Sequence, residues 1–141
     1  HITFEIVLKH KRRYIALRRH DAIPGHEAPI HAKKYPKGLL YFCHGLIRYD
    51  ESAESCVARI VKEQAGVCVN AIRFVYLDSS VQGKDNQWAI TPHIIAEVDK
   101  IPKPGRYGND VTEVVTFDVK NIPNDFGWWS QKELMEFLRK L

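Results

Sequence analysis

The segment from Gly45 to Val67 holds the side chains whose types and spacing favour chemistry. It reads GLIRYDESAESCVARIVKEQAGV and places two carboxylates, Glu51 and Glu63, on either side of Arg59. If residues 52–65 form a helix, Arg59 and Glu63 lie one turn apart on one face. Carboxylate oxygens are hard ligands of the kind that Mg²⁺ prefers, and a carboxylate beside an arginine can also form a plain ion pair. The segment therefore suggests a cation site or an ordered junction between loop and helix.

This segment resembles the signature box of the Nudix hydrolases. The family pattern is Gly, five residues, Glu, seven residues, Arg-Glu, an aliphatic residue, any residue, Glu-Glu, any residue, Gly and an aliphatic residue. Seven of its nine defined positions agree, namely Gly45, Glu51, Arg59, Val61, Glu63, Gly66 and Val67. The stretch TEVVTFDVKNIP is similar to the closing strand and turn of the family, so the resemblance covers nearly the whole chain. It implies an α/β fold, a Nudix-like α/β/α sandwich with a mixed sheet, over a single domain of residues 1–141.

Two positions depart from the box, because Ile60 and Gln64 stand where the family has glutamates. Those carboxylates hold a divalent metal against a diphosphate in the family. The resemblance therefore implies Mg²⁺ or Mn²⁺, weakly bound by Glu63, the amide oxygen of Gln64 and the carbonyl of Gly45. Ile60 continues the apolar stripe of the helix, so we expect it in the core. The turn 59–64 carries two cations and one carboxylate, a formal charge of +1.

The catalytic set implied by the resemblance is Glu63, Arg59 and Glu51. In the family the arginine orients carboxylates rather than touching substrate. The alternative for Glu51 and Arg59 is an ordinary salt bridge that locks the loop to the helix.

The missing carboxylates leave the general base to be found elsewhere. Relatives take an acidic or histidine side chain from the loop before the closing strand, and Glu113 is the first candidate here. Asp110 and Glu97 are weaker alternatives, and each is expected more often as a solvated surface carboxylate. His44 stands beside the box where relatives usually have glycine, and a partly buried polar role is the main expectation.

Substrate contacts are expected from the residues that lead into the box and from exposed aromatics. Lys33 and Lys37 are positioned in sequence to face a diphosphate, and Trp88 could stack on a base. Further residues considered with them are Lys34, Tyr107 and Trp128. Three histidines in the first long loop, His20, His26 and His31, give only a weak metal signal, since zinc ligands are usually paired at closer spacing.

Charge is uneven along the 141 residues. Residues 1–40 carry nine Lys/Arg and three Asp/Glu, a net +6, and residues 41–141 carry twelve and fourteen, a net −2. Six of the early cations are expected at a hairpin turn and at strand ends, namely Lys9, Lys11, Arg12, Arg13, Arg18 and Arg19. A solvated hairpin is the main interpretation, and a patch that contacts phosphate or RNA is the alternative.

Composition points to a folded protein of the cytoplasm. Hydrophobic residues make up 45% and aromatic residues 11%, which excludes disorder of the whole chain. The longest stretch without a charged residue, 86–96, has eleven residues, against about 20 needed to cross a bilayer. Glu5 and Lys9 interrupt the first apolar run, so no signal peptide is expected. Three cysteines without a C-x-x-C pair predict buried free thiols in a reducing compartment.

The elements that would position these residues follow from periodicity. Alternation over 2–8 and an apolar run over 14–17 predict a hairpin, and further strands are expected over 39–43, 67–77, 88–98 and 113–119. Long loops are expected over 18–37 and 99–110. Apolar residues at helical spacing predict a helix over 52–65, capped by Gly66. Ser130 and Glu133 form a capping box that opens a closing helix with Leu134, Phe137, Leu138 and Leu141 on its buried face.

Two classes of function are consistent with these observations. The first is a Mg²⁺-dependent, MutT-like hydrolase of a nucleoside diphosphate linked to another group, weakened by loss of two carboxylates. The second is a catalytically inactive module that binds a nucleotide or RNA. GDP-mannose mannosyl hydrolases also resemble the chain in having an apolar residue after the box arginine, so glycosyl transfer to water is a further alternative. We expect a nucleotide-type small molecule as partner and no membrane, and pairing into a homodimer is left open.

Overall fold

The computed structural model describes residues 1–19, 29–82, 86–107 and 109–141. The side chains at 82, 106, 107, 109 and 110 lie outside this description. Of the residues singled out above, His20 and His26 and the side chains of Tyr107 and Asp110 therefore cannot be placed.

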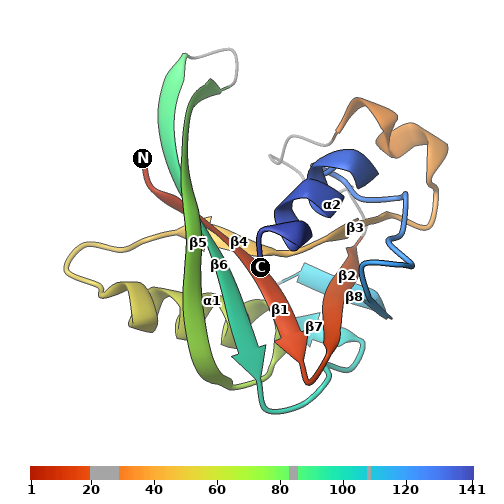
Figure 1. Cartoon of the computed structure of the whole chain (residues 1–141), viewed down its shortest axis with the longest axis horizontal. Coiled ribbons are helices and arrows are strands. Elements are labelled where there is room, and N and C mark those ends of the chain that lie inside the picture. Colours follow the sequence, from red (N-terminus) through yellow and green to blue (C-terminus); the bar gives the residue numbers. More distant parts are fainter. Residues whose placement is uncertain (20–28, 83–85, 108) are drawn as a thin grey trace.

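The described residues form one mixed sheet with a helix on each face (Figure 1). The strand order is β5-β6-β1-β2-β8-β7, with β3 beside β2 and β4 beside β1. The strands are β1 (Thr3–His10), β2 (Arg13–Arg19), β3 (Leu39–Tyr41), β4 (Cys43–Leu46), β5 (Val69–Gln82), β6 (Gln87–Val98), β7 (Gly105–Tyr107) and β8 (Asn109–Phe117). The helices are the 3-10 helix η1 (Ile30–Lys34), α1 (Ala53–Ala65) and α2 (Gln131–Arg139). Only β1 and β6 pair in parallel among these strands, so the α/β/α sandwich with a mixed sheet is confirmed.

Both faces of the central strand β1 are buried, each under a different helix. Ile6 and Leu8 belong to the core beneath α1, whereas Val7 belongs to the core beneath α2. Successive side chains of a strand point to opposite faces, so β1 contributes to two cores at once. The polar residues of β1 (Thr3, Glu5, Lys9 and His10) are half-buried, whereas its apolar residues Phe4, Ile6, Val7 and Leu8 are buried.

Helix α1 begins and ends at the residues that its sequence predicts. The Ser52 hydroxyl accepts a hydrogen bond from the backbone N–H of Ser55 at 3.1 Å, and Gly66 ends the helix in the left-handed conformation, with φ of 67°. Glycine suits that conformation because it has no Cβ. The buried face is Cys56, Val57, Ile60, Val61 and Ala65.

Helix α2 is tied to the sheet at the residues just before it. The predicted capping box is present, and Leu134, Phe137 and Leu138 are buried while Leu141 is half-buried. The backbone N–H of Leu40 donates to the carbonyl of Asp125 at 2.9 Å, and the N–H of Gly127 donates to the carbonyl of Leu40 at 2.9 Å. Gly127 lies against the Tyr41 ring, so a Cβ would collide with it.

Several expectations about the strands and loops need correction. The expected strand over 39–43 is two strands, since β3 pairs with β2 and β4 pairs with β1. The expected loop over 99–110 contains β7 and the start of β8, because the glycines and prolines there permit a small hairpin. The other expected loop contains η1.

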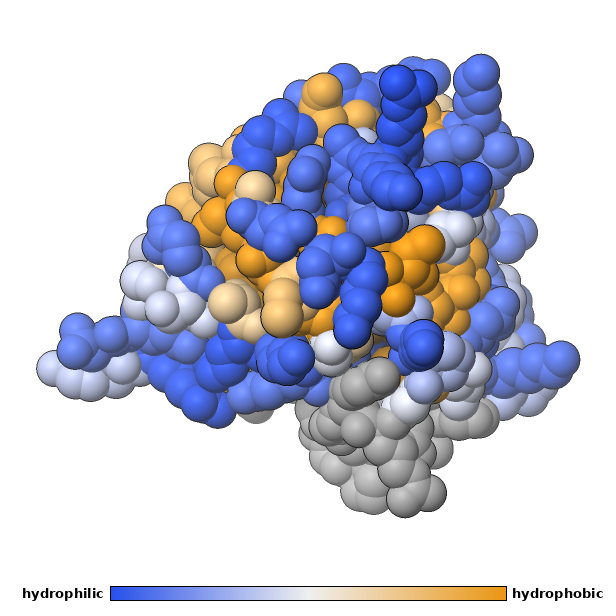
Figure 2. All heavy atoms as spheres, turned by 90° about the horizontal axis from the view of Figure 1, so that it is seen from below, coloured by the Kyte–Doolittle hydropathy of each residue, from blue (hydrophilic) through white to orange (hydrophobic). Residues whose placement is uncertain are grey.

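The exposure of two residues differs from what the sequence predicts, and some apolar residues lie at the surface. Cys43 and Cys56 are buried, but Cys68 is exposed. Ala53, which the helical spacing in the sequence places on the apolar face of the predicted helix, is also exposed, at the first turn of α1. Seen from below, apolar residues show at the surface between charged side chains (Figure 2). Within the described part of the chain, no helix is long and apolar enough to cross a membrane.

Candidate functional site

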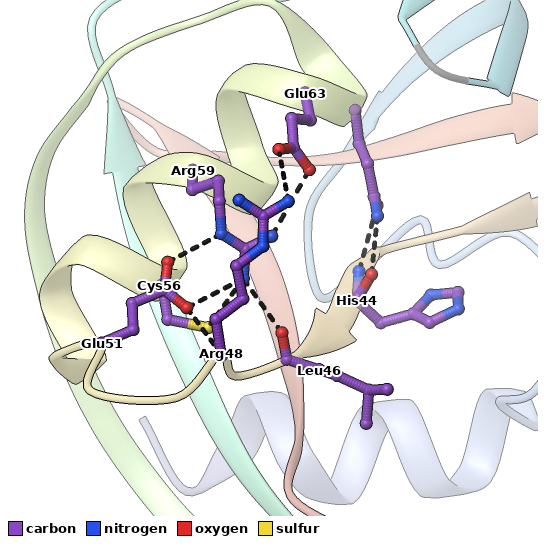
Figure 3. A network of polar contacts seen from close by, with 8 residues as sticks. His44, Leu46, Arg48, Glu51, Cys56, Arg59 and Glu63 are labelled. Atoms are coloured by element: carbon purple, nitrogen blue, oxygen red, sulfur yellow. Dashed lines mark hydrogen bonds and ion pairs between the residues drawn. The ribbon is translucent and has the colours of Figure 1, made fainter.

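Glu51 and Arg59 form the expected ion pair, and it fixes the loop between β4 and α1 (Figure 3). Arg59 Nε donates to Glu51 Oε1 at 2.7 Å and Nη2 donates to Oε2 at 2.9 Å. The same Nη2 donates to the carbonyl of Leu46 at 2.9 Å. Hydrogen bonds from Arg59 and from the backbone of Arg48 hold the pKa of Glu51 down to about 2. The pair therefore positions the loop, which both the family role and the plain salt bridge predict.

Glu63 lies on the same helix but is engaged by two guanidinium groups. Its Oε2 is 3.4 Å from Arg59 Nη1, and its Oε1 is 3.6 Å from Arg48 Nη2. The side chain is half exposed, at 51%. A metal ion would have to compete with both arginines for this carboxylate, and their positive charge would repel it.

Gln64 braces α1 against β4, although the resemblance suggests it as a metal ligand. Its Oε1 accepts hydrogen bonds from the N–H of His44 and from Arg19 Nη2, both at 3.1 Å. Its Nε2 donates to the carbonyl of His44 at 2.6 Å. A glutamate could not make that last bond, since a carboxylate has no proton to donate. Both the oxygen and the nitrogen of the Gln64 amide are thus hydrogen-bonded, and the guanidinium of Arg19 already occupies the oxygen.

Ile60 is buried as expected, with 1% of its surface exposed. It packs against Gly45, where an added Cβ would come within 3.1 Å of Ile60 Cδ1. The absence of a side chain at Gly45 therefore lets β4 lie close to α1. The aliphatic residue is part of the core at the position where the family pattern has a carboxylate.

The donor set at this turn does not fit a Mg²⁺ ion. Such an ion is usually held by at least one or two carboxylates that are free to bind it. Among the described residues, no three His, Cys, Asp or Glu side chains are grouped so as to hold a metal. Glu63 is shared by two arginines and Gln64 is already hydrogen-bonded. The expectation of a weak Mg²⁺ or Mn²⁺ site at Glu63, Gln64 and Gly45 is not supported by this arrangement.

The candidate bases on the strands do not meet this turn. Glu113 Oε2 binds Arg18 Nε at 2.7 Å, and Arg18 Nη1 binds Asp125 Oδ2 at 2.6 Å. This cluster lies on the α2 side of the sheet, because Glu113 is two residues from Val115, which packs on the α2-side core. Glu97 pairs with Lys9 at 4.0 Å. Glu113 is therefore separated by the sheet from the helix that carries Glu63.

A pocket of about 730 Å³ lies between the sheet and α2. Strand residues Glu5, His44, Tyr76 and His93 line one side, and residues from Trp128 to Lys140 line the other. His44 connects this pocket to the box, since its side chain lines the cavity and its backbone is held by Gln64. Periodicity alone did not single out this pocket.

Two titratable groups on the floor of the pocket have unusual environments. Burial raises the pKa of Glu5 to about 7, although a hydrogen bond from Trp129 Nε1 at 3.1 Å and the charge of Arg19 act in the opposite direction. Burial lowers the pKa of His93 to about 4. His93 is 7% exposed, stacks on Tyr76 with ring centres 4.2 Å apart, and has no hydrogen-bond partner for Nδ1 among the described residues. Perturbed groups in a cavity are characteristic of binding and catalytic sites.

The expected substrate contacts lie outside this pocket. Lys33 and Lys37 are exposed in and after η1, whose His31 Nε2 is 3.0 Å from the carbonyl of Phe126. Trp88 is on the β5–β6 hairpin, where its Nε1 donates to Ser79 Oγ at 2.8 Å. Trp128, named as a secondary candidate, does line the pocket.

Comparison with known proteins places this geometry in a family. The model of the NUDIX domain matches residues 6–138. A MutT NUDIX hydrolase from Burkholderia pseudomallei has a TM-score of 0.69 at 12% identity, covering 99% of this chain and 96% of that one. The pyrophosphohydrolase BsRppH of Bacillus subtilis has a TM-score of 0.68 at 15% identity, covering 98% and 78%.

A third solved structure is the NUDIX domain of Shewanella oneidensis NrtR complexed with ADP ribose. It has a TM-score of 0.64 at 20% identity, covering 99% of this chain and 86% of that one. None of the curated proteins matches the chain. At such identities the structural likeness shows the fold, and the family model covers most of the sequence. The chain therefore belongs to the NUDIX domain family.

Proposed function

We propose that this NUDIX domain binds a nucleotide-type ligand in the α2 pocket and does not use its box helix for metal-dependent hydrolysis. The observation that carries the proposal is the contrast at His44. On one side of β4, Gln64 and Arg19 fill the position that the family resemblance gives to a metal ligand. On the other side, the pocket is open and lined by aromatic rings.

The chemistry of the pocket suits the base of such a ligand. Trp128 lines the pocket and is 54% exposed, so it can stack on a planar ring, and base–aromatic stacking is worth about 1–3 kcal/mol per base. The cavity is acidic, with carboxylates such as Glu5 and one lysine, so a ligand's phosphates are better placed outside it. The NrtR domain, which has the same fold, is seen with ADP ribose, and this compound is therefore the first probe.

The test is a titration of the protein with ADP-ribose, ADP and GDP-sugars, followed by tryptophan fluorescence. We expect saturable binding of at least one of these compounds, unchanged by EDTA. Trp128→Ala should weaken it by about tenfold, because stacking is lost. Trp88→Ala is the matched control, since Trp88 is similarly exposed, at 62% against 54%, but lies off the pocket. Phosphate release that needs Mg²⁺ and is lost in Glu63→Gln would overturn the proposal.

A hydrolase is the second candidate, and Glu5 is the observation that favours it. A carboxyl group with a pKa of about 7 can take a proton from water near neutral pH. This second role differs from the first in requiring the diphosphate to enter the pocket, where the water oxygen would bond to phosphorus while the anhydride bond breaks and the leaving phosphate departs. Long incubations of the same compounds in EDTA test this role. Turnover that is absent in Glu5→Gln but retained in Glu63→Gln would favour the hydrolase.

A further inference from the structure

Strand β5 is an exposed edge of the sheet. It has 14 residues, pairs with β6, and has no other neighbouring strand in the described part of the chain. In Figure 1 it runs the full height of the molecule and rises above the body of the domain together with β6. An edge of this length presents a row of backbone N–H and C=O groups that another strand can pair with.

The edge carries apolar side chains that the domain does not cover. Phe74 is 58% exposed, Leu77 is 56% exposed and Val81 is 65% exposed. Phe74 lies opposite Ile94, a member of the α1-side core, so it points to that face of the sheet. Leu77 lies opposite Pro92, next to His93 of the pocket, and points to the same face as Phe74. Uncovered apolar residues on a strand edge favour association.

The strand contains just two charged residues, Arg73 and Asp78. Both are exposed, and neither forms an ion pair within the described residues. Arg73 lies opposite Ile95 of the α2-side core, and Asp78 lies opposite Thr91, which lines the pocket. The two opposite charges therefore project from the same face of one strand.

The order of these residues is self-complementary under a twofold axis. The β5–β6 register shifts between Phe74 and Tyr76, so Val75 and Tyr76 together take one position of the ladder. If a second β5 runs antiparallel about an axis through that position, Phe74 of each copy faces Leu77 of the other. In the same register Arg73 faces Asp78 of the other copy, on both sides of the axis.

We propose that β5 pairs antiparallel with β5 of a second copy of this chain, giving a twofold homodimer. Two cross-strand ion pairs and two Phe74–Leu77 contacts form at once, and the free backbone groups of each edge become paired. Such an isologous interface closes on itself, because both copies use the same strand edge. An unrelated partner strand would have no reason to repeat this order of charges.

The pairing also reaches the pocket. Tyr76 and Asp78 line it, so the second copy's Arg73 would lie beside the Asp78 carboxylate at the mouth. That arginine would offset part of the negative charge of the mouth. The inference stands on the strand edge alone, and it holds whether or not the pocket binds a nucleotide.

The test is sedimentation velocity over a concentration series with charge-reversal variants. We expect the wild type to be a dimer. Arg73→Asp and Asp78→Arg should each weaken it by about tenfold or more, because like charges then face each other twice. The double variant R73D/D78R should restore the affinity to within about threefold. Lys103→Asp, an exposed reversal in a loop, is the control that should change nothing.

Mixing the two single variants sharpens the test. In the mixture, a strand that carries two carboxylates faces a strand that carries two guanidinium groups, so a mixed dimer should form where neither variant pairs with itself. A wild type that stays monomeric throughout, or a mixture no more associated than its components, would overturn the proposal. Circular dichroism checks folding, and Phe74→Lys tests the same register if a charge variant does not melt cooperatively.

Discussion

The turn of α1 around Glu63 and the pocket under α2 lie on opposite sides of β4, and their polar groups are in different states. At the turn, each of the box side chains Glu51, Arg59, Glu63 and Gln64 is already bonded to another part of the protein. In the pocket, His93 has a buried nitrogen without a partner among the described residues, and burial raises the pKa of Glu5 to about 7. Saturated groups hold a fold together, whereas unsatisfied buried groups mark places where a ligand can bind.

The largest effect is expected from restoring the family's carboxylate at the turn. Ile60→Glu should lower the free energy of unfolding by about 4 kcal/mol or more, because it buries a charge where the present side chain is 1% exposed. Ile60→Val, the matched control, should cost about 1 kcal/mol. Urea denaturation measures both. If Ile60→Glu together with Gln64→Glu is stable and binds Mn²⁺, the turn is a dormant metal site and the comparison fails.

A smaller loss of stability should distinguish Gln64, which bonds to the backbone of His44, from Glu63, which is half exposed beside it. Gln64→Leu should cost about 2 kcal/mol, because the backbone N–H and carbonyl of His44 lose their partner. Glu63→Gln, one residue away and half exposed, should cost less than about 1 kcal/mol. Urea denaturation measures both variants, and equal losses would mean that the hydrogen bonds from Gln64 to the His44 backbone contribute no more than the exposed ion pairs of Glu63.

The environment of Glu5 in the pocket should make the free energy of unfolding depend on pH. The pKa of Glu5 is about 7 in the folded protein against an ordinary value of 4.5, so the folded state holds more protons between these values. Stability from this group is therefore lost as pH rises from 4.5 to 7. Glu5→Gln should gain about 2 kcal/mol relative to wild type between pH 5 and pH 8. A difference that stays flat with pH would show that Glu5 is solvated.

The titration of His93 changes stability with pH in the opposite direction to that of Glu5 over part of the same pH range. Its pKa of about 4 lies below the usual 6.5, so the unfolded chain binds the extra proton and stability falls as pH drops from 6.5 to 4. The two slopes partly cancel in the wild type. Replacing Glu5 alone should expose the slope of His93.

The elements with strong local signals were predictable from the sequence. The alternation of Ile2 to Lys9, the Ser52 cap with Gly66, and the Ser130–Glu133 capping box each contain their structural cause within a few residues. The box likewise predicted the Glu51–Arg59 pair, since its spacing sets both residues at one loop–helix junction.

The pocket was not predictable in the same way. Thr3, Glu5 and Val7 share one face of β1, and nothing in their spacing shows that α2, more than a hundred residues later, covers it. Glu113 was expected near the box because relatives take a base from the loop before the closing strand, but the face it occupies depends on its pairing with Arg18. Gln64 is a further case, because its residue type fits a metal ligand, whereas only the structure shows that its amide is hydrogen-bonded to His44 and Arg19.

The two backbone hydrogen bonds that join Leu40 to Asp125 and Gly127 fix the chain just before the residues that form one side of the α2 pocket. They hold the segment that leads into Trp128 and Trp129, and Gly127 packs so closely against the Tyr41 ring that a Cβ would collide with it. If the pocket binds a nucleotide as proposed, little conformational entropy should be lost on binding, because this wall is already held in place. Association should then be limited by diffusion through the open mouth, with no slow phase from movement of the helix.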